Sequence, residues 1–433
     1  MRSFASLQQQ VKRLLSSGLS GGAGTVRIAG SLAIASCLVL SACGGGGDSA
    51  STAPTTPTTP TTPTPPVTPT IVNSIPMTVD AGPTGDGSVI NQPYVSVTIC
   101  APGTTSCQTI DHILVDTGSY GLRIIAPGIL NASLSLPSAT TTGGATIGEC
   151  VKFTSGYTWG SVKKADVKLG GEIASNLPIN IIGDTSFATV PTACRNTANV
   201  NLGTVANLGA NGILGVGVFK EDCGTACATQ ARSDAYYSCS GSACTAITLP
   251  IAQQVSNPVA SFPQDNNGVV LVLPSVPAGG VSTLNGSLIF GIGTQSNNAF
   301  ASENVYTTNN IGNFTTLYKG RTLTTSYLDS GSNGYFFADS SIAQCSSSTG
   351  FYCPPSTLSL SAVNTGTNGT TGTVNFTVEN VDSLSPSVSA ASIAGSSDSN
   401  TFDWGLPFFF GRRVFVAIDQ ASTPKGVGPY WAY

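Results

Sequence analysis

The stretch DHILVDTGSYGL at residues 111–122 has a partner, SYLDSGSNGY, at residues 326–335. Both read apolar, apolar, Asp, Thr or Ser, Gly, Ser. In each copy the apolar run predicts a buried strand that ends at an aspartate, Asp116 or Asp329, and the glycine that follows permits a sharp turn. Two such turns could set the aspartates face to face. Neighbouring carboxylates resist joint ionisation, so such a pair can share one proton and activate a water molecule.

The same residues allow other interpretations. Two ordinary Asp-Gly turns are the plain alternative. A calcium loop starting at Asp329 is excluded, because Gly331 and Ser340 stand where an EF-hand needs a ligand and a glutamate. A Ser-His-Asp or Cys-His enzyme would have to use His112, the only histidine, and no Gly-x-Ser-x-Gly elbow occurs. We expect His112 to be a partly exposed strand residue.

The N-terminal residues predict an export signal. Basic residues and no acidic ones precede an apolar run at residues 28–40, which is too short to cross a bilayer. The run closes with LSAC at residues 40–43, which resembles a bacterial lipoprotein processing site. We therefore expect residues 1–42 to be a lipoprotein signal peptide and Cys43 to carry the lipid, with plain cleavage and secretion as the alternative. Such an anchor holds a domain at a membrane without spanning it.

Composition then limits the class of protein. Residues 43–73 are glycines followed by Thr-Pro repeats, which predict an extended, semi-rigid tether. Without residues 1–42 the chain carries 13 basic and 21 acidic side chains. No basic patch is present, so a nucleic-acid partner is not expected. About 360 residues follow the tether, which suffices for one large two-lobed unit or for two domains.

The cysteines indicate an oxidising compartment. Ten of them follow Cys43, an even number that suggests disulfides. A zinc site is disfavoured by the single histidine and by the lack of paired Cys-x-x-Cys spacing, so no metal is expected. Connectivity is not fixed by sequence, and other pairings stay open. Short separations favour Cys100–Cys107, Cys223–Cys227, Cys239–Cys244 and Cys345–Cys353, leaving Cys150 for Cys194.

Short β-branched and aromatic runs between Gly, Pro and Asn predict a mostly β chain. Residues 93–115 read as a hairpin, and residues 153–171 read as a second one with GYTWG (156–160) at its tip, suited to a mobile cover over a cleft. A cysteine-rich loop at 223–244 and a short helix at 249–255 are expected next. Residues 269–273 and 286–291 then read as buried strands.

In this order the motifs resemble the pepsin-like aspartic peptidases over nearly all of residues 90–420. The specific part is the combination of Asp116-Thr117-Gly118-Ser119 with Asp329-Ser330-Gly331-Ser332. The whole chain also resembles a bacterial lipoprotein family of unassigned function. The peptidase resemblance implies an all-β, bilobal pepsin-like (acid protease) fold with a cleft between two β lobes. We place the lobes at residues 74–265 and 266–433.

The resemblance also implies roles, carried over residue by residue. Asp116 and Asp329 would be the catalytic dyad, one acting as general base toward water and the other as general acid. Thr117 and Ser330 would brace the two loops against the facing backbone. Gly118 and Gly331 would donate backbone N–H groups to the inner carboxylate oxygens, and Ser119 and Ser332 would bond the outer ones.

The cover hairpin departs from the family pattern. Alignment on the glycine pair 170–171 places Phe153 where the family has its flap tyrosine, whereas side-chain chemistry favours Tyr157, with Trp159 beside it. A phenylalanine there would lose the hydrogen bond of the phenol.

The function predicted from these residues is an aspartic-type endopeptidase of the cell envelope. Its alternative is a non-catalytic, pepsin-like surface lipoprotein that binds a peptide or glycan in its cleft. A structural protein whose aspartate motifs only brace the lobes is a third reading. We expect a monomer that acts on a peptide or protein, needs no cofactor, and reaches a membrane, most simply the outer one, through its lipid anchor.

Overall fold

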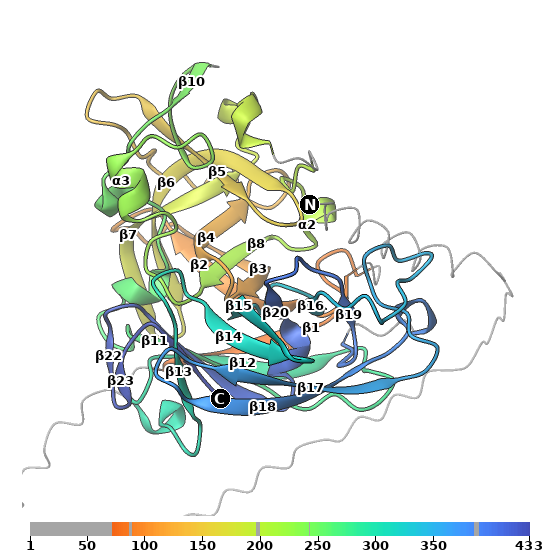
Figure 1. Cartoon of the computed structure of the whole chain (residues 1–433). Helices are drawn as coiled ribbons and strands as arrows, with labels where there is room; N and C mark the ends of the chain where they lie inside the picture. The colour runs from red at the N-terminus through yellow and green to blue at the C-terminus, as the bar shows by residue number, and fades with distance from the viewer. Residues whose placement is uncertain (1–71, 86–88, 196–199, 242, 385–388) are drawn as a thin grey trace, which may run out of the picture. The chain divides into compact units, whose positions relative to one another are not determined.

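The computed structural model describes residues 72–85, 89–195, 200–241, 243–384 and 389–433 (Figure 1). The predicted signal peptide, the lipidation at Cys43 and nearly all of the tether lie outside these residues. No helix in the described ranges is both long enough and apolar enough to cross a membrane.

Strands make up nearly all of the regular structure, as the sequence predicts. Those before residue 250 are β1 (Ser74–Val79), β2 (Pro93–Cys100), β3 (Cys107–Asp116), β4 (Tyr120–Ile125), β5 (Thr146–Lys152), β6 (Tyr157–Leu169), β7 (Glu172–Ile182), β8 (Gly212–Val216), β9 (Tyr236–Ser240) and β10 (Ala243–Ala246). Those after it are β11 (Gly268–Leu273), β12 (Leu284–Phe290), β13 (Val305–Thr307), β14 (Phe314–Tyr318), β15 (Arg321–Leu328), β16 (Tyr335–Phe337), β17 (Leu358–Thr365), β18 (Thr371–Val378), β19 (Ala394–Gly395), β20 (Phe402–Trp404), β21 (Arg412–Ala417), β22 (Ser422–Thr423), β23 (Gly426–Val427) and β24 (Tyr430–Ala432).

Helices in the described part are short. They are α2 (Val205–Leu208), α3 (Thr225–Thr229) and the 3-10 turns η1 (Thr185–Phe187), η2 (Thr192–Cys194), η3 (Ile251–Gln253), η4 (Pro258–Ser261), η5 (Ser296–Asn298), η6 (Val381–Ser383) and η7 (Leu406–Phe409). The helix expected at residues 249–255 is therefore wrong. Pro250 precedes the single 3-10 turn η3, and the chain returns to an extended conformation at Gln254.

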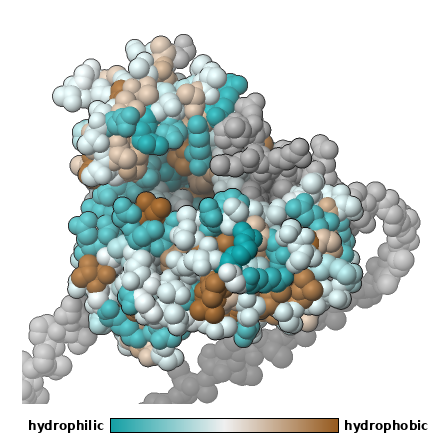
Figure 2. All heavy atoms as spheres, in the orientation of Figure 1, coloured by the Kyte–Doolittle hydropathy of each residue, from teal (hydrophilic) through white to brown (hydrophobic). Residues whose placement is uncertain are grey.

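Two sheets carry the fold. The larger has the order β10-β9-β5-β6-β7-β4-β8-β3-β2-β1-β12-β11-β21-β24-β13, and an extra β6–β2 pairing closes its first half into a barrel-like ring. The second sheet has the order β18-β17-β14-β15-β20-β16-β19. In Figure 1 the ring lies above and the second sheet below, and β3 and β15 approach each other between them. The chain is all-β and bilobal, and Figure 2 shows its surface recessed between the upper and lower parts.

Both lobes contain the same four-strand motif. In the first, β3 pairs parallel with β8, β8 antiparallel with β4, and β4 parallel with β7. In the second, β15, β20, β16 and β19 pair in the same order with the same directions. The repeat seen in the two aspartate stretches therefore extends to the strands around them. Each motif delivers one aspartate to the end of its first strand.

The cores of the two lobes differ in chemistry. Around β3 and β8 the buried side chains are aliphatic, whereas around β20 they are aromatic. Phe402 and Trp404 stack with centroids 3.9 Å apart, and Phe337 stacks on Phe402 at 4.8 Å. Such aromatic pairs bury large areas and are geometrically specific. They hold β20 firmly beneath the Asp329 loop.

The local predictions can be compared with the structure. The hairpin at residues 93–115 is confirmed as antiparallel β2 and β3, and the strands at 269–273 and 286–291 correspond to β11 and β12. The expected cysteine-rich loop instead contains α3 and the β9–β10 hairpin. The five predicted disulfides are confirmed: Cys100–Cys107, Cys150–Cys194, Cys223–Cys227, Cys239–Cys244 and Cys345–Cys353.

Candidate active site

The carboxyl groups of Asp116 and Asp329 meet between the two lobes. Burial, the negative charge of Asp116 and a hydrogen bond with its carboxyl group together raise the pKa of Asp329 to about 8. A Cβ atom on Gly118 would lie 2.7 Å from Cγ of Asp329, and one on Gly331 would lie 2.8 Å from Oδ1 of Asp116. Any larger residue at either glycine would therefore push the opposing carboxyl group away. These contacts explain why both motifs contain glycine after the Thr or Ser.

Each aspartate is held by its own loop in the same way. The N–H of Gly118 donates to Oδ1 of Asp116 at 2.8 Å, and Ser119 donates to Oδ2 at 2.5 Å. In the second loop the N–H of Gly331 lies 2.8 Å from Oδ1 of Asp329. The inner and outer oxygens of the two carboxyl groups are thus approached by equivalent groups, which fixes their orientation before any ligand arrives.

Ser332 reaches the outer oxygen Oδ2 of Asp329 at 2.9 Å, and a third acid, Asp403, lies on its other side at 2.7 Å. Asp403 is buried on β20, and sequence reasoning missed it because it sits inside an apolar segment with no motif of its own. The feature of the sequence that could have identified Asp403 is its position between Phe402 and Trp404. A lone acid among buried aromatic residues has to have a partner.

Thr117 and Ser330 join the two loops across the lobes. The hydroxyl of Thr117 accepts from the N–H of Ser330 at 2.9 Å and donates to the carbonyl of Leu328 at 3.0 Å. Reciprocally, the hydroxyl of Ser330 accepts from the N–H of Thr117 at 3.1 Å and donates to the carbonyl of Val115 at 2.7 Å. Both residues are fully or almost fully buried. Four hydrogen bonds in a dry environment therefore set the separation of the aspartates.

The pair is open to an incoming molecule on one side. Gly118 is exposed, and Ser119, Asp329, Gly331 and Ser332 are half-buried, although Asp116 keeps only 7% of its surface accessible. The arrangement is suited to acid–base chemistry, because two oriented carboxyl groups lie against each other and the pKa of one of them, Asp329, is raised to about 8.

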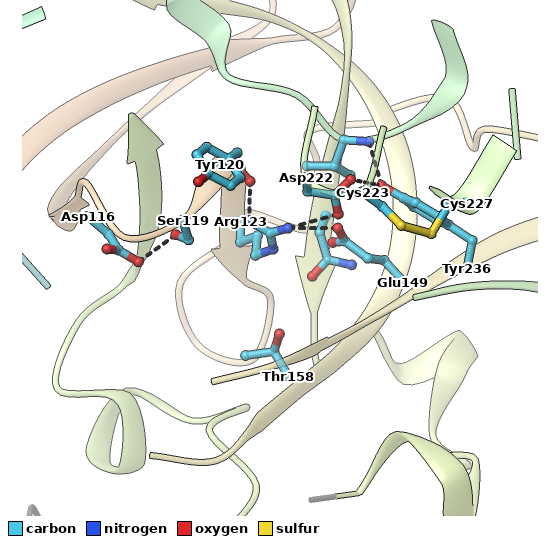
Figure 3. Close-up of polar contacts among 12 residues, drawn as sticks. Asp116, Ser119, Tyr120, Arg123, Glu149, Thr158, Asp222, Cys223, Cys227 and Tyr236 are labelled. Carbon is cyan, nitrogen blue, oxygen red and sulfur yellow. Dashed lines mark hydrogen bonds and ion pairs between the residues drawn. A yellow bond between two sulfur atoms is a disulfide. The ribbon is translucent and has the colours of Figure 1, made fainter. Parts of the chain in front are cut away.

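A buried charged cluster lies behind the first loop, and the sequence did not reveal it (Figure 3). Arg123 donates to the carbonyl of Tyr120 at 2.6 Å, to Glu149 at 2.8 Å and to Asp222 at 3.2 Å. Tyr236 donates to Asp222 at 2.5 Å. Burial and the neighbouring Glu149 raise the pKa of Asp222. Register pairs Glu149 of β5 with Tyr236 of β9, whereas Arg123 comes from β4, which β6 and β7 separate from β5 in the sheet order, so only the folded sheet assembles the cluster.

The predicted cover hairpin differs from expectation. Its turn is at residues 153–156, and residues 157–160 belong to strand β6, so the tip lies earlier than predicted. Tyr157 pairs with Asn201, and the Cys150–Cys194 disulfide cross-links the same hairpin. The expected tip at residues 156–160 is therefore wrong in its position, since these residues lie in or next to the start of strand β6.

The aromatic candidates on the hairpin pack inward. Trp159 donates its indole N–H to the carbonyl of Phe187 at 2.8 Å and contacts the ring of Tyr237 edge-on. Tyr157 is buried in the same cluster, while Phe153 packs partly buried in a neighbouring one. These aromatic residues therefore serve as packing residues of the first lobe.

The fold and site thus define a two-lobed all-β protein in which facing loops present a pair of aspartates. The chain belongs to the family described as "Protein of unknown function (DUF3443)", whose model matches residues 69–433. The expectation of a family without an assigned function is confirmed. A search of curated proteins finds no match.

Proposed function

We propose that this protein is an aspartic-type endopeptidase with a pepsin-like arrangement of its two lobes. The observation that carries the proposal is the contact between the carboxyl groups of Asp116 and Asp329, each oriented by a glycine N–H and a serine hydroxyl. Two acids are costly to bury side by side. Ion-pair partners would offset that cost in a purely structural role, and among the described residues none of the ion pairs includes either aspartate.

The mechanism follows from the shared proton. Asp329, with its pKa raised to about 8, keeps the proton near neutral pH and serves as general acid. Asp116 serves as general base. A water molecule attacks the peptide carbonyl carbon while Asp116 takes its proton and Asp329 protonates the carbonyl oxygen. The proton on Asp116 then passes to the leaving nitrogen as the C–N bond breaks, and one hydroxyl proton of the tetrahedral intermediate returns to Asp329, which leaves a carboxylic acid and restores the starting protonation of both aspartates. No covalent intermediate and no cofactor are involved.

The setting proposed for this activity is the cell envelope. The N-terminal pattern that closes at Cys43 supports a lipid anchor, and the Thr-Pro segment supports a tether that gives the domain reach. Five disulfides fit an oxidising compartment. The substrate is a peptide or an unfolded protein segment, acted on by a monomer.

The test is cleavage of a denatured protein mixture between pH 3 and 9. The wild-type protein is compared with Asp116→Asn and Asp329→Asn, and a statine-type transition-state mimic is added as inhibitor. Asp234→Asn is the matched control, since Asp234 is exposed and paired only with Arg232. We expect cleavage by the wild type and the control, and a loss of at least about 1000-fold in both dyad variants.

Two outcomes would reject the proposal. One is cleavage that survives both dyad substitutions and the inhibitor. The other is the absence of cleavage at every pH while peptides or glycans still bind, which would support the non-catalytic alternative. Binding is measured by calorimetry on the same preparations.

A further inference from the structure

Asp403 lies next to the aspartate pair because of strand alternation. Its neighbours Phe402 and Trp404 stack in the aromatic core, and successive residues of a strand point to opposite faces, so Asp403 points away from that core. On this side its carboxyl group meets the hydroxyl of Ser332, which also contacts Asp329. The three groups form a line from Asp403 through Ser332 to Asp329.

The contacts among Asp403, Ser332 and Asp329 require that one of the two carboxyl groups is protonated. A serine hydroxyl has one hydrogen and can donate to only one acceptor, yet the oxygen of Ser332 lies 2.9 Å from Oδ2 of Asp329 and 2.7 Å from Oδ2 of Asp403. If both acids were ionised, one contact would set two acceptors against each other. One carboxyl group must therefore carry a proton and donate to Ser332.

Asp403 is the better candidate for that proton. It is 6% exposed, and its Oδ1 is buried without a hydrogen-bond partner. An unpartnered carbonyl oxygen of a neutral acid costs far less than an unpartnered oxygen of an ionised one. Burial and the charges of Asp329 and Asp116 raise the pKa of Asp403. The other titratable group that faces it is Tyr327 on β15, whose neighbouring Asp403 helps to raise the pKa of the phenol and so favours its neutral form.

At the register position equivalent to Asp403, the described part of the first lobe has an apolar residue instead of an acid. In the parallel pair β15–β20, Tyr327 lies opposite Asp403, and the next residue of each strand follows in the same way, with Leu328 opposite Trp404. In the matching pair β3–β8, Leu114 aligns with Ile213 at the corresponding step. Ile213 is buried and apolar, so nothing comparable stands behind Ser119. The two loops, otherwise matched bond for bond, are made unequal by Asp403.

We propose that Asp403 is a neutral positioning residue for the proposed hydrolysis: it donates to Ser332, and Ser332 must then direct its only hydrogen to the outer oxygen of Asp329. The inner oxygen of Asp329 is left to hold the proton shared with Asp116, which assigns the general acid to the second lobe. The inference rests on the proposed function for its catalytic consequence. Its statement about protonation stands without that function.

The kinetic test compares Asp403→Asn and Asp403→Leu in the full chain. Asparagine keeps an N–H donor toward Ser332 and carries no charge, so kcat should stay within about 3-fold of wild type and the alkaline limb of the pH profile should not move. Leucine removes the donor, and we expect kcat to fall about 10-fold or more with little change in KM. Ser332→Ala combined with Asp403→Leu should lose no more than Ser332→Ala alone, because both changes act through one hydroxyl.

A different kinetic result is expected if Asp403 is ionised. If Asp403 were ionised, Asp403→Asn would remove a negative charge beside Asp329 and shift the alkaline limb by about one pH unit toward acid. That shift, or equal losses for Asn and Leu, would overturn the proposal.

A second measurement does not depend on activity. Infrared difference spectra at pH 7 between wild type and Asp403→Asn should show that one protonated-carboxyl C=O band is lost in the variant, while the band of protonated Asp329 is common to both proteins and cancels. Loss of an ionised carboxylate band instead would refute the assignment even in an active enzyme. Should the protein cleave nothing, the proposed function fails together with the positioning role, and the band alone decides whether Asp403 is protonated.

Discussion

Thr117 and Ser330 hold each other's backbone: each hydroxyl accepts the N–H of the other residue, at 2.9 Å and 3.1 Å. Each also donates to a carbonyl of the opposite loop. The residues are 213 positions apart in the sequence. The bonds are buried, so no water competes for them. They therefore fix the distance between Asp116 and Asp329, which directly precede the two residues.

Replacing either hydroxyl should therefore cost stability. Thr117→Val preserves shape but leaves the N–H of Ser330 and the carbonyl of Leu328 unpaired, and we expect a loss of about 2–4 kcal/mol in urea unfolding. Ser330→Ala should lose a similar amount. Thr98→Val is the control, because the Thr98 hydroxyl bonds only Thr109 at an exposed site and its loss should cost under about 0.5 kcal/mol. A Thr117→Val effect no larger than the control would contradict the bracing role.

The disulfides should contribute unequally to stability. Cys150–Cys194 spans 44 residues, whereas Cys223–Cys227 spans 4. A longer loop gains more from closure, so replacing the first pair by alanines should cost about 4 kcal/mol in the chain-entropy account, and the second pair clearly less. Urea unfolding of the two double variants measures the difference. Equal losses would show that loop closure is not what the Cys150–Cys194 bond supplies.

Stability should decrease as the pH rises toward 8. Asp329 ionises near pH 4 in an unfolded chain but has a pKa of about 8 in the fold, so the folded state retains a proton that the unfolded state has released. The stabilisation is complete below pH 4 and is lost as pH rises through 8. Melting temperatures between pH 4 and 9 should fall, and Asp329→Asn should reduce the slope. Part of the slope should remain in Asp329→Asn, because Asp222 and Asp403 also have raised pKa values.

The sequence predicted the contact between Asp116 and Asp329 more fully than it predicted the residues that surround them. Two four-residue motifs were enough to place Asp116 and Asp329, since their order of side chains already contains the donors that each loop needs. Disulfides followed from spacing, because four of the five pairs are separated by at most 8 residues. These are local properties that a sequence displays directly.

The residues missed depend on strand register. Arg123 meets Glu149 and Asp222 only after β4, β5 and β9 take their places in the sheet, and no motif records that pairing. Asp403 reaches Ser332 through the parallel β15–β20 pair, across 71 residues. The hairpin tip was misplaced because glycines at 156 and 160 suggested a turn, whereas a partner segment at residue 201 and the Cys150–Cys194 bond determine where the strand begins.

The Arg123 cluster should be essential to the first lobe. Arg123→Met keeps the apolar stem but leaves the buried carboxyl groups of Glu149 and Asp222 without their cation, and removal of one partner from a buried ion pair typically costs about 3–5 kcal/mol. Arg232→Met is the matched control at an exposed pair, where the change should stay under about 1 kcal/mol. Urea unfolding compares them. An Arg123→Met protein as stable as the control would mean that the cluster is not held together by its charge.

A single added methyl group at Gly118 should separate chemistry from stability. The backbone of Gly118 suits any residue, so alanine brings no conformational strain, but its Cβ would lie 2.7 Å from Cγ of Asp329 and would displace that carboxyl group. Displacement by about 1 Å can reduce a catalysed rate about 100-fold, and we expect kcat/KM to fall by about that factor. The melting temperature should change by only a few degrees, since Gly118 is exposed.

Gly143→Ala is the control, because the nearest atom to its added Cβ is 3.9 Å away. If Gly118→Ala cleaves peptides as fast as Gly143→Ala does, Asp329 cannot be working from the position it occupies in this structure.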